Sequence, residues 1–355
     1  MPRNFHPRAA RRCILTAAVV FVIATLLGNV LVDHCPLSAR FPEADLALKA
    51  WRAHISAPGI VFLGSSRTGY SASVEIIGPK VRQISGDAAV EVFSAAIPVG
   101  DPLTMNFMGS HLFADGRRSK IAVVEITPDS VSRRNRFLDF AVTRQFTFRD
   151  IVENRGDICH STNKTLSRVL SSRLTPFYTH RLALQAWARE KWSGSEHVIP
   201  SGDTGNYYYD GIWGQSSIPQ ELPGPPPMMR IEEDLPRVRK QLADYEIPGR
   251  TSAALEDLVA RCHRDGIKVI LLETPMHSAL RALFVPSVSQ PYGQFVRHLQ
   301  DAYGCQFVDF SDRLSDSMFF DGVHTNGDGR AYFSALFAEE VLGPVWRAEI
   351  GSRHE

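Results

Sequence analysis

Two stretches far apart in the sequence carry residue types that could perform nucleophilic chemistry. The first is IVFLGSSRTGYSAS (60–73), in which an apolar run leads through a glycine to Ser66 and then into a helix-like segment. The second is FFDGVHTNGDGRAYFSALF (319–337), in which Asp321 precedes His324 by three residues. A serine hydroxyl becomes a nucleophile when an imidazole accepts its proton and a carboxylate orients that imidazole. We therefore predict a catalytic group of Ser66, His324 and Asp321.

Each stretch also has an ordinary structural interpretation, so the two must meet in space for chemistry to follow. Serine is a common helix N-cap, and a loop aspartate can cap a turn beside a surface histidine. A strand-to-helix turn would place Ser66 at the carboxyl edge of a sheet, where a helix N-terminus supplies N–H groups and positive potential. His324 follows the last predicted strand, so we expect it to emerge at the same edge.

Short apolar runs that alternate with helical patterns predict an α/β fold with a mostly parallel, doubly wound sheet. Unbroken apolar runs of this length are typical of strands that are buried on both faces. The expected strands lie at 59–63, 90–97, 120–126, 268–273 and 306–310.

The chain divides into parts of different composition. We expect a basic tail, an apolar anchor, a connector, one large domain and a short C-terminal tail, at 1–12, 13–32, 33–58, 59–345 and 346–355. Within the large domain, a long insertion at 127–250 separates the third and fourth expected strands. Connections of such length are usually functional or disordered. The first half of the insertion has amphipathic helical patterns, whereas its second half is rich in Gly, Pro, Ser and Tyr, which is typical of an irregular surface loop.

Aromatic residues cluster in the second half of this insertion. They would suit contacts with a substrate, and equally a segment that merely packs on the domain. The candidates are Tyr207, Tyr208, Tyr209 and Trp213.

The N-terminal segment has the pattern of a single transmembrane helix. The run 13–32 is apolar, and its length matches the roughly 20 residues that span a bilayer. Four arginines and no acidic residue precede it, and acidic residues follow it, which places the N-terminus in the cytoplasm and the domain outside. A cleaved signal peptide is the alternative, but the run exceeds the usual apolar region and no small-x-small cleavage site follows.

Composition excludes several other functions. The formal net charge is +1 and the basic residues beyond the N-terminus are scattered, so we expect no nucleic-acid partner. None of the five cysteines lies in a C-x-x-C pair, so we expect neither a metal site nor a cofactor. No phosphate-binding G-x4-G-K-S/T motif is present.

The joint pattern of Ser66 after the first strand with Asp321 and His324 after the last resembles the SGNH/GDSL hydrolase family. The resemblance extends from 59 to about 342, with LGSSRT as its first block and DGVHTNGDGRAYFS as its last. It implies a flavodoxin-like three-layer α/β/α sandwich with Ser66 as nucleophile, His324 as general base and Asp321 as its orienting carboxylate. VILLETPMH (269–277) is similar to a segment of membrane-anchored members that assist D-alanyl transfer to teichoic acid or O-acetylate alginate.

Two middle blocks depart from the pattern of that family. Its second block offers a glycine whose N–H helps to bind the oxyanion, whereas SAAIPVGDP has Val99 at that position and Gly100 next to it. Its third block ends a strand with Gly-x-Asn-Asp, whereas VVEITPDS has no asparagine. The oxyanion candidates that follow are Ser66, Gly100, Thr127 and Asp129.

Two functions are compatible with these observations. The first is a membrane-anchored, extracytoplasmic serine esterase or O-acyltransferase that acts on acyl esters of cell-envelope polysaccharide, with Arg67 as a candidate substrate contact. The second is a catalytically inactive relative that binds a glycan or a multi-pass membrane acyltransferase. The polysaccharide and the membrane partner are implied by the resemblance alone.

Overall fold

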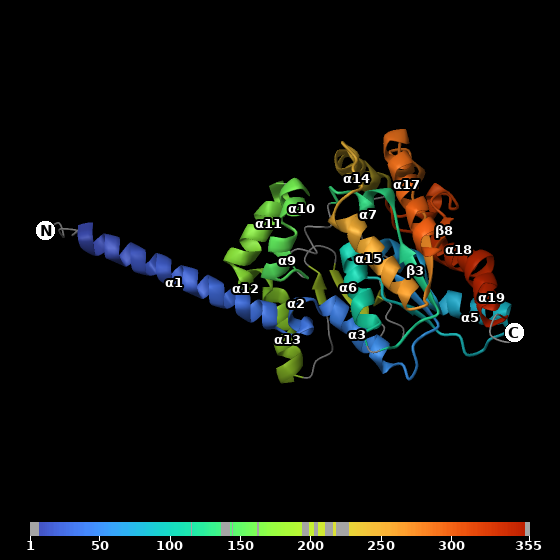
Figure 1. Cartoon of the computed structure of the whole chain (residues 1–355), viewed down its shortest axis with the longest axis horizontal. Helices are drawn as coiled ribbons and strands as arrows, with labels where there is room; N and C mark the ends of the chain where they lie inside the picture. Colours follow the sequence, from blue (N-terminus) through green and yellow to red (C-terminus); the bar gives the residue numbers. More distant parts are fainter. Residues whose placement is uncertain are drawn as a thin grey trace.

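A five-stranded parallel sheet forms the centre of the protein (Figure 1). The computed structural model describes residues 7–114, 116–135, 143, 145–161, 163–193, 199–201, 205–209, 216–217 and 227–351. The sheet has the order β2-β1-β3-β7-β8, and every neighbouring pair is parallel. Its strands are β1 Ile60–Leu63, β2 Val92–Ser94, β3 Ile121–Glu125, β7 Lys268–Glu273 and β8 Gln306–Asp309. This order is that of flavodoxin-like sheets, so the predicted fold class is confirmed.

The sheet is buried on both faces because its strands are apolar at almost every position. All residues of β1, β2 and β3 are buried. The register pairs Leu63 with Val124, Glu125 with Leu272, and Glu273 with Asp309. The carboxyl ends of β1, β3, β7 and β8 therefore lie along one edge of the sheet, and the loops that follow these strands can meet there.

Helices cover the two faces and complete three layers. One face carries α3 Pro42–Ala53, α6 Pro102–Leu112, α15 Arg250–Arg264 and α17 Pro286–Tyr303. The opposite face carries α5 Val74–Ser85, α18 Gly327–Phe337, the π-helical turn η2 Ala338–Leu342 and α19 Gly343–Gly351. Alternate strand residues point to each layer: Val61 and Leu63 to the first, Ile60 and Phe62 to the second.

Both ends of the domain extend beyond the boundaries expected from the sequence. The predicted connector contains α2 Leu37–Arg40 and α3, and Phe41, Leu48 and Trp51 from it are buried in the core. The predicted C-terminal tail begins inside α19, whose Trp346 is buried with 2% exposure. A Cβ atom on Gly59 would lie 2.3 Å from the Trp346 ring, so this ring packs directly against the backbone at the start of β1.

The insertion is helical in its first half, as predicted. The helices of this half are α7 Pro128–Val131, α9 Phe148–Glu153, α10 Arg155–Ser161, α11 Asn163–Leu174, α12 Pro176–Thr179 and α13 Arg181–Ser193. A further helix, α14 Pro227–Leu242, lies near the end of the insertion. In the half expected to be irregular, the described residues form an antiparallel sheet of β4 Ile199–Ser201, β5 Gly205–Tyr209 and β6 Ser216–Ser217. Beyond the insertion, α16 Ser278–Arg281 and the 3-10 turn η1 Asp316–Met318 flank the carboxyl edge of the main sheet.

A long N-terminal helix, α1 Pro7–His34, projects from the body (Figure 1). Residues 10–34 of this helix are long and apolar enough to cross a membrane by length and composition, with a mean hydropathy of 2.4. Its large apolar side chains are open to solvent, with Ile14 at 69% and Leu26 at 60% exposure. A water-soluble helix would hide such a surface.

A buried carboxyl at the end of β7 makes stability depend on pH. Glu273 is 6% exposed, and the Tyr292 hydroxyl donates a hydrogen bond to its Oε2 at 2.9 Å. Burial, together with the nearby Asp309 charge, raises the pKa of Glu273 from 4.5 to about 8. Because the folded pKa lies above the unfolded one, this group contributes full stability below the unfolded pKa, and the contribution is lost as pH rises toward 8.

We predict that Glu273→Gln removes most of this pH dependence. Raising the pH from 5 to 9 should cost the wild type up to about 4 kcal/mol more than the variant, because only the wild type must ionise a buried carboxyl. Urea unfolding of both proteins across this pH range measures the difference. Parallel losses of stability in the two proteins would contradict the buried, neutral state of Glu273.

Candidate active site

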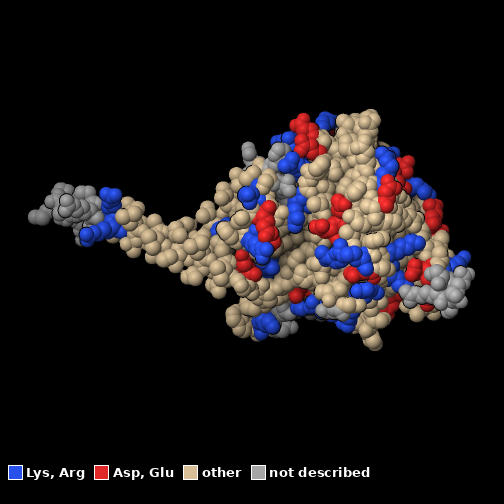
Figure 2. Space-filling view, viewed as in Figure 1, with Lys and Arg blue, Asp and Glu red and all other residues tan. Residues whose placement is uncertain are grey.

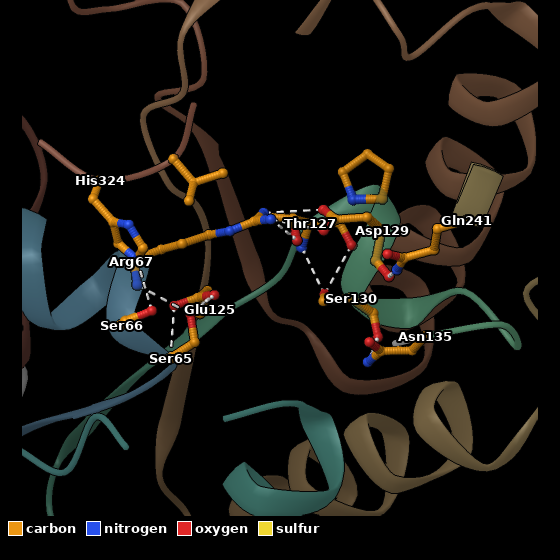
Figure 3. A network of polar contacts seen from close by, with 12 residues as sticks. Ser65, Ser66, Arg67, Glu125, Thr127, Asp129, Ser130, Asn135, Gln241 and His324 are labelled. Carbon is orange, nitrogen blue, oxygen red and sulfur yellow. Dashed lines mark hydrogen bonds and ion pairs between the residues drawn. The ribbon is translucent and has the colours of Figure 1, made fainter. Parts of the chain in front are cut away.

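The serine, histidine and aspartate singled out in the sequence lie in one hydrogen-bonded chain. Ser66 is the first residue of α4 Ser66–Ser71, directly after β1, and His324 lies in the loop before α18. His324 Nε2 lies 2.8 Å from Ser66 Oγ, across 258 residues of sequence. His324 Nδ1 lies 2.6 Å from Asp321 Oδ2. The two stretches therefore meet at the carboxyl edge of the sheet, as Figure 3 shows for Ser66 and His324.

Helix capping at this turn is done by Ser65 and leaves the Ser66 hydroxyl to the histidine. Ser65 Oγ accepts the backbone N–H of Arg67 at 3.1 Å and donates to Glu125 Oε1 at 2.6 Å. The capping interpretation of this motif thus applies to the neighbouring serine. The Ser66 hydroxyl lies instead within hydrogen-bonding distance of the His324 imidazole.

A buried carboxylate at the end of β3 holds the turn 64–68, which we name the nucleophile turn for the role predicted for Ser66. Glu125 Oε2 accepts the N–H of Ser65 at 2.8 Å, and the N–H and hydroxyl of Thr68 at 3.1 and 2.6 Å. A Cβ atom on Gly64 would lie 2.2 Å from Thr68 Oγ1 and 2.8 Å from Glu125 Oε2, so only glycine fits there. Glu125 was not among the site residues predicted from the sequence. The sequence feature that could have identified it is an acidic residue at the end of an otherwise apolar strand.

Asp321 is held in its ionised form. Its Oδ1 accepts the backbone N–H groups of Val323 and His324 at 2.8 and 2.7 Å. Burial alone would raise the pKa of Asp321, but the charge of His324 and these hydrogen bonds lower it to about 2. An ionised Asp321 accepts a hydrogen bond from the Nδ1–H of His324, which leaves Nε2 as the acceptor for the Ser66 hydroxyl.

Two aromatic rings that the sequence analysis did not single out enclose the imidazole. The Tyr70 ring centroid lies 4.7 Å from that of His324, and the Phe320 ring stacks on His324 at 5.5 Å and 16°. Thr325 Oγ1 donates to the Tyr70 carbonyl at 2.9 Å and joins the histidine loop to α4. Both aromatic residues lie inside the two motif stretches, but spacing alone gave no sign that they face one another.

Three of the candidate residues bind one another instead of facing the nucleophile. Arg67 is 5% exposed and makes a bidentate pair with Asp129, at 3.0 and 2.7 Å, and its Nη1 also donates to Thr127 Oγ1 at 3.0 Å. Burial would lower the pKa of Arg67, but the Asp129 carboxylate raises it, so the guanidinium stays charged. The Thr127 N–H donates to Ser130 Oγ at 3.0 Å. These residues tie α4 to α7 (Figure 3) rather than offering groups to a substrate.

A strained turn adjoins the nucleophile turn where the family pattern has a glycine. The Gly100 N–H donates to the Ile97 carbonyl at 2.8 Å, which closes a turn with Pro98 and Val99 at its centre. Val99 has a φ of +60°, a conformation that a β-branched residue rarely adopts and that costs of order 1–3 kcal/mol. The backbone thus keeps a glycine-like shape without the glycine, and the Gly100 N–H proposed for the oxyanion is already engaged.

Two backbone N–H groups near Ser66 have no hydrogen-bond acceptor among the described residues. The N–H groups of Ser65 and Thr68 donate to Glu125 of β3, and those of Arg67 and Gly69 donate to Ser65. Among the described residues, no acceptor is found for the N–H of Ser66 or for that of Val99. These two donors are therefore available to a negatively charged oxygen.

The remaining candidates lie in the insertion. Tyr207, Tyr208 and Tyr209 belong to β5, and Trp213 lies outside the described residues. Within the part of the chain that the structure describes, no group of three or more His, Cys, Asp or Glu side chains is placed to hold a metal ion.

We predict that Gly100→Ala disrupts the site. The added Cβ would lie 2.7 Å from the Ile97 carbonyl oxygen and 3.1 Å from that of Gly64, and such overpacking costs about 1–3 kcal/mol. The matched control is Gly156→Ala in α10, where the added Cβ meets nothing within 4 Å and helix propensity favours alanine by up to about 1 kcal/mol. Chemical denaturation should show a loss of stability for the first variant and none for the second. Equal stabilities would contradict the close approach at Gly100.

Comparison with known proteins gives remote structural similarity only. No protein-family model matches the chain, and no curated protein matches it. Among solved structures, it is similar to the lipase/acylhydrolase from Enterococcus faecalis, with 11% identity and a TM-score of 0.36 over 81% of this chain and 96% of that one. It is also similar to an alpha/beta hydrolase enzyme from the metagenome of Lake Arreo, Spain, with 12% identity and a TM-score of 0.36 over 80% and 95%. With both TM-scores below 0.5, these similarities add no weight to the role of any site residue.

Proposed function

We propose that this protein is a serine esterase or O-acyltransferase whose nucleophile is Ser66. The observation that carries the proposal is the chain from Ser66 Oγ to His324 Nε2 at 2.8 Å and from His324 Nδ1 to Asp321 Oδ2 at 2.6 Å. A hydroxyl, an imidazole and an ionised carboxylate in this order are the parts that acyl transfer through a serine ester requires.

The reaction would proceed in two halves through a covalent ester. Ser66 Oγ attacks the acyl carbonyl carbon while His324 Nε2 takes its proton, and the carbonyl electron pair moves to the oxygen. The tetrahedral intermediate then collapses, and His324 returns the proton to the departing alcohol. In the second half, water or an acceptor hydroxyl attacks the acyl-Ser66 ester while His324 takes its proton. The ester bond to Ser66 Oγ then breaks and Oγ regains the proton from His324, which completes hydrolysis or transfer respectively.

The open N–H groups of Ser66 and Val99 would bind the oxyanion. Both lack an acceptor among the described residues and belong to the two turns that pack together at the end of β1. The strain at Val99 suits this role, because conformations of this kind concentrate where a backbone group must be aimed. Each donor would contribute about two to three orders of magnitude in rate.

We further propose that α1 anchors the domain outside the cytoplasm and that the acyl esters are those of envelope polysaccharide. The basic residues before α1 and the acidic residues after it favour this orientation. An anchored enzyme acts on what lies near the membrane, and the resemblance to membrane-anchored SGNH proteins supports a polysaccharide. Transfer on that side needs acyl groups carried across the membrane, which a multi-pass membrane acyltransferase would supply.

Ester hydrolysis by the purified full-length protein tests this assignment. We predict that p-nitrophenyl acetate is cleaved, and that Ser66→Ala and His324→Ala each lower kcat by at least about 10³-fold. An inactive relative would show equal, background rates in all three proteins.

Two matched substitutions control for nonspecific loss. Among the described residues, Ser110 Oγ lies 3.1 Å from His111 Nδ1 but no carboxylate is bonded to that imidazole. In the same part of the chain, His298 Nε2 lies 2.8 Å from Glu256 Oε1 but no serine is bonded to that imidazole. Ser110→Ala and His298→Ala should therefore leave the rate within about twofold of wild type. A loss in these variants as large as in Ser66→Ala would remove the special role of the proposed site.

A further inference from the structure

The helices of the insertion pack against the C-terminal end of α1. A Cβ atom on Gly28 would lie 3.0 Å from Pro176 Cγ and 3.2 Å from the Phe177 ring, so α12 sits directly on α1. Asn29 Nδ2 donates to the Arg173 carbonyl at 2.7 Å, and Arg173 Nη1 donates to Asp33 at 2.8 Å. The body is thus fixed to α1 by packing and hydrogen bonds over its last two turns.

This contact lies inside the apolar part of α1, not beyond it. The apolar run ends at Val32, and Gly28 precedes the first acidic residue, Asp33, by five positions. At a rise of 1.5 Å per residue, α12 meets α1 about 7 Å before that polar end. Helices that lie in a membrane interface are buried to about this depth, roughly 5–10 Å. If α1 spans a bilayer, α12 must therefore lie at its surface.

The insertion helices beside this contact expose apolar side chains at positions where a soluble surface would be polar. Leu166, Leu170 and Leu174 follow one face of α11 with 42%, 53% and 50% exposure. A different face of α11 packs inward through Val169, which is 6% exposed. The neighbouring α9 and α12 add Phe148, Val152, Phe177 and Tyr178, which are between 45% and 65% exposed. We name these seven exposed residues the apolar patch.

The apolar patch is continuous with α1, and the insertion helices that carry it have more basic than acidic residues. Phe148 N–H donates to Asp33 Oδ2 at 3.0 Å, so α9 also adjoins the end of α1. Figure 2 shows an uninterrupted uncharged surface along α1, from the basic residues near its N-terminus to the body. Residues 147–193 carry eight Lys and Arg but four Asp and Glu. Aromatic and leucine side chains with surplus basic residues are the composition of segments that bind anionic membrane surfaces.

We propose that the apolar patch is seated in the lipid of the membrane that α1 spans, so that α9, α11 and α12 form a second, interfacial attachment of the domain. This proposal rests on the anchoring proposed above. Lipid is the expected partner of the patch, because the contact with α1 places the patch at the level of the membrane interface. The domain would then be held in one orientation against the membrane, since α1 continues through α2 into the buried α3 without a flexible linker.

Site-specific photo-crosslinking to lipid tests the proposal on the full-length protein. Benzoylphenylalanine is placed at Leu170 or Tyr178 in the patch, and the protein is reconstituted into vesicles of phosphatidylcholine and phosphatidylglycerol. Ile23 of α1 is the positive control, and Tyr332 of α18, which is 48% exposed, is the matched control outside the patch. After irradiation, intact-mass spectrometry measures the fraction of protein that carries a phospholipid.

We expect phospholipid adducts at Leu170 and Tyr178 at roughly ten times the yield at Tyr332, because interfacial side chains contact acyl chains. Adducts at Ile23 without adducts at the two patch positions would overturn this proposal and leave the anchoring intact. Crosslinks from the patch to a second copy of the chain, or to another protein, would overturn it as well. No adduct at Ile23 would overturn the anchoring and the interfacial attachment together.

Discussion

The hydrogen bond between Ser66 and His324 joins the two ends of the domain, and the rest of the site is arranged to make it possible. Its partners are separated by 258 residues, and they meet only because β1 lies inside the sheet and its carboxyl end shares one edge with β7 and β8. Thr325 and Ser334 reinforce the junction by bonds to the carbonyls of Tyr70 and Ser71. If the sheet order were different, the serine and the histidine would be two unrelated polar residues.

Buried charge fixes the geometry of this edge. Glu125 gathers four hydrogen bonds from Ser65 and Thr68, and Arg67 is locked to Asp129. Groups of this kind are costly to bury and are strongly destabilising when one partner is removed, so the nucleophile turn has few alternative conformations. The strained backbone conformation of Val99 is tolerated because Gly100 and Gly64 are closely packed around it. This packing prevents the turn from adopting another conformation.

The sequence predicted the features that depend on local pattern and missed those that depend on long-range approach. Apolar runs gave the five strands, and motif spacing gave Ser66, Asp321 and His324. Glu125 could not be assigned, because its partners Ser65 and Thr68 lie far away in the sequence, in the turn that follows β1. Arg67 looked available because its pairing with Asp129 joins two distant segments. The sequence predicts a tail at Trp346, because a single aromatic residue in a short segment shows no hydrophobic periodicity. Its burial depends on the space beside Gly59, where a side chain is absent.

The central claim is that the Ser66 hydroxyl is activated by His324. The most direct measurement is the site of covalent modification by a fluorophosphonate, read from peptide mass spectrometry of the full-length protein. We expect one phosphonyl group on the peptide that contains Ser66, and none on that peptide in His324→Ala, because the base that activates the hydroxyl is gone. Labelling of another residue, or an unmodified Ser66 in the wild-type protein, would contradict it.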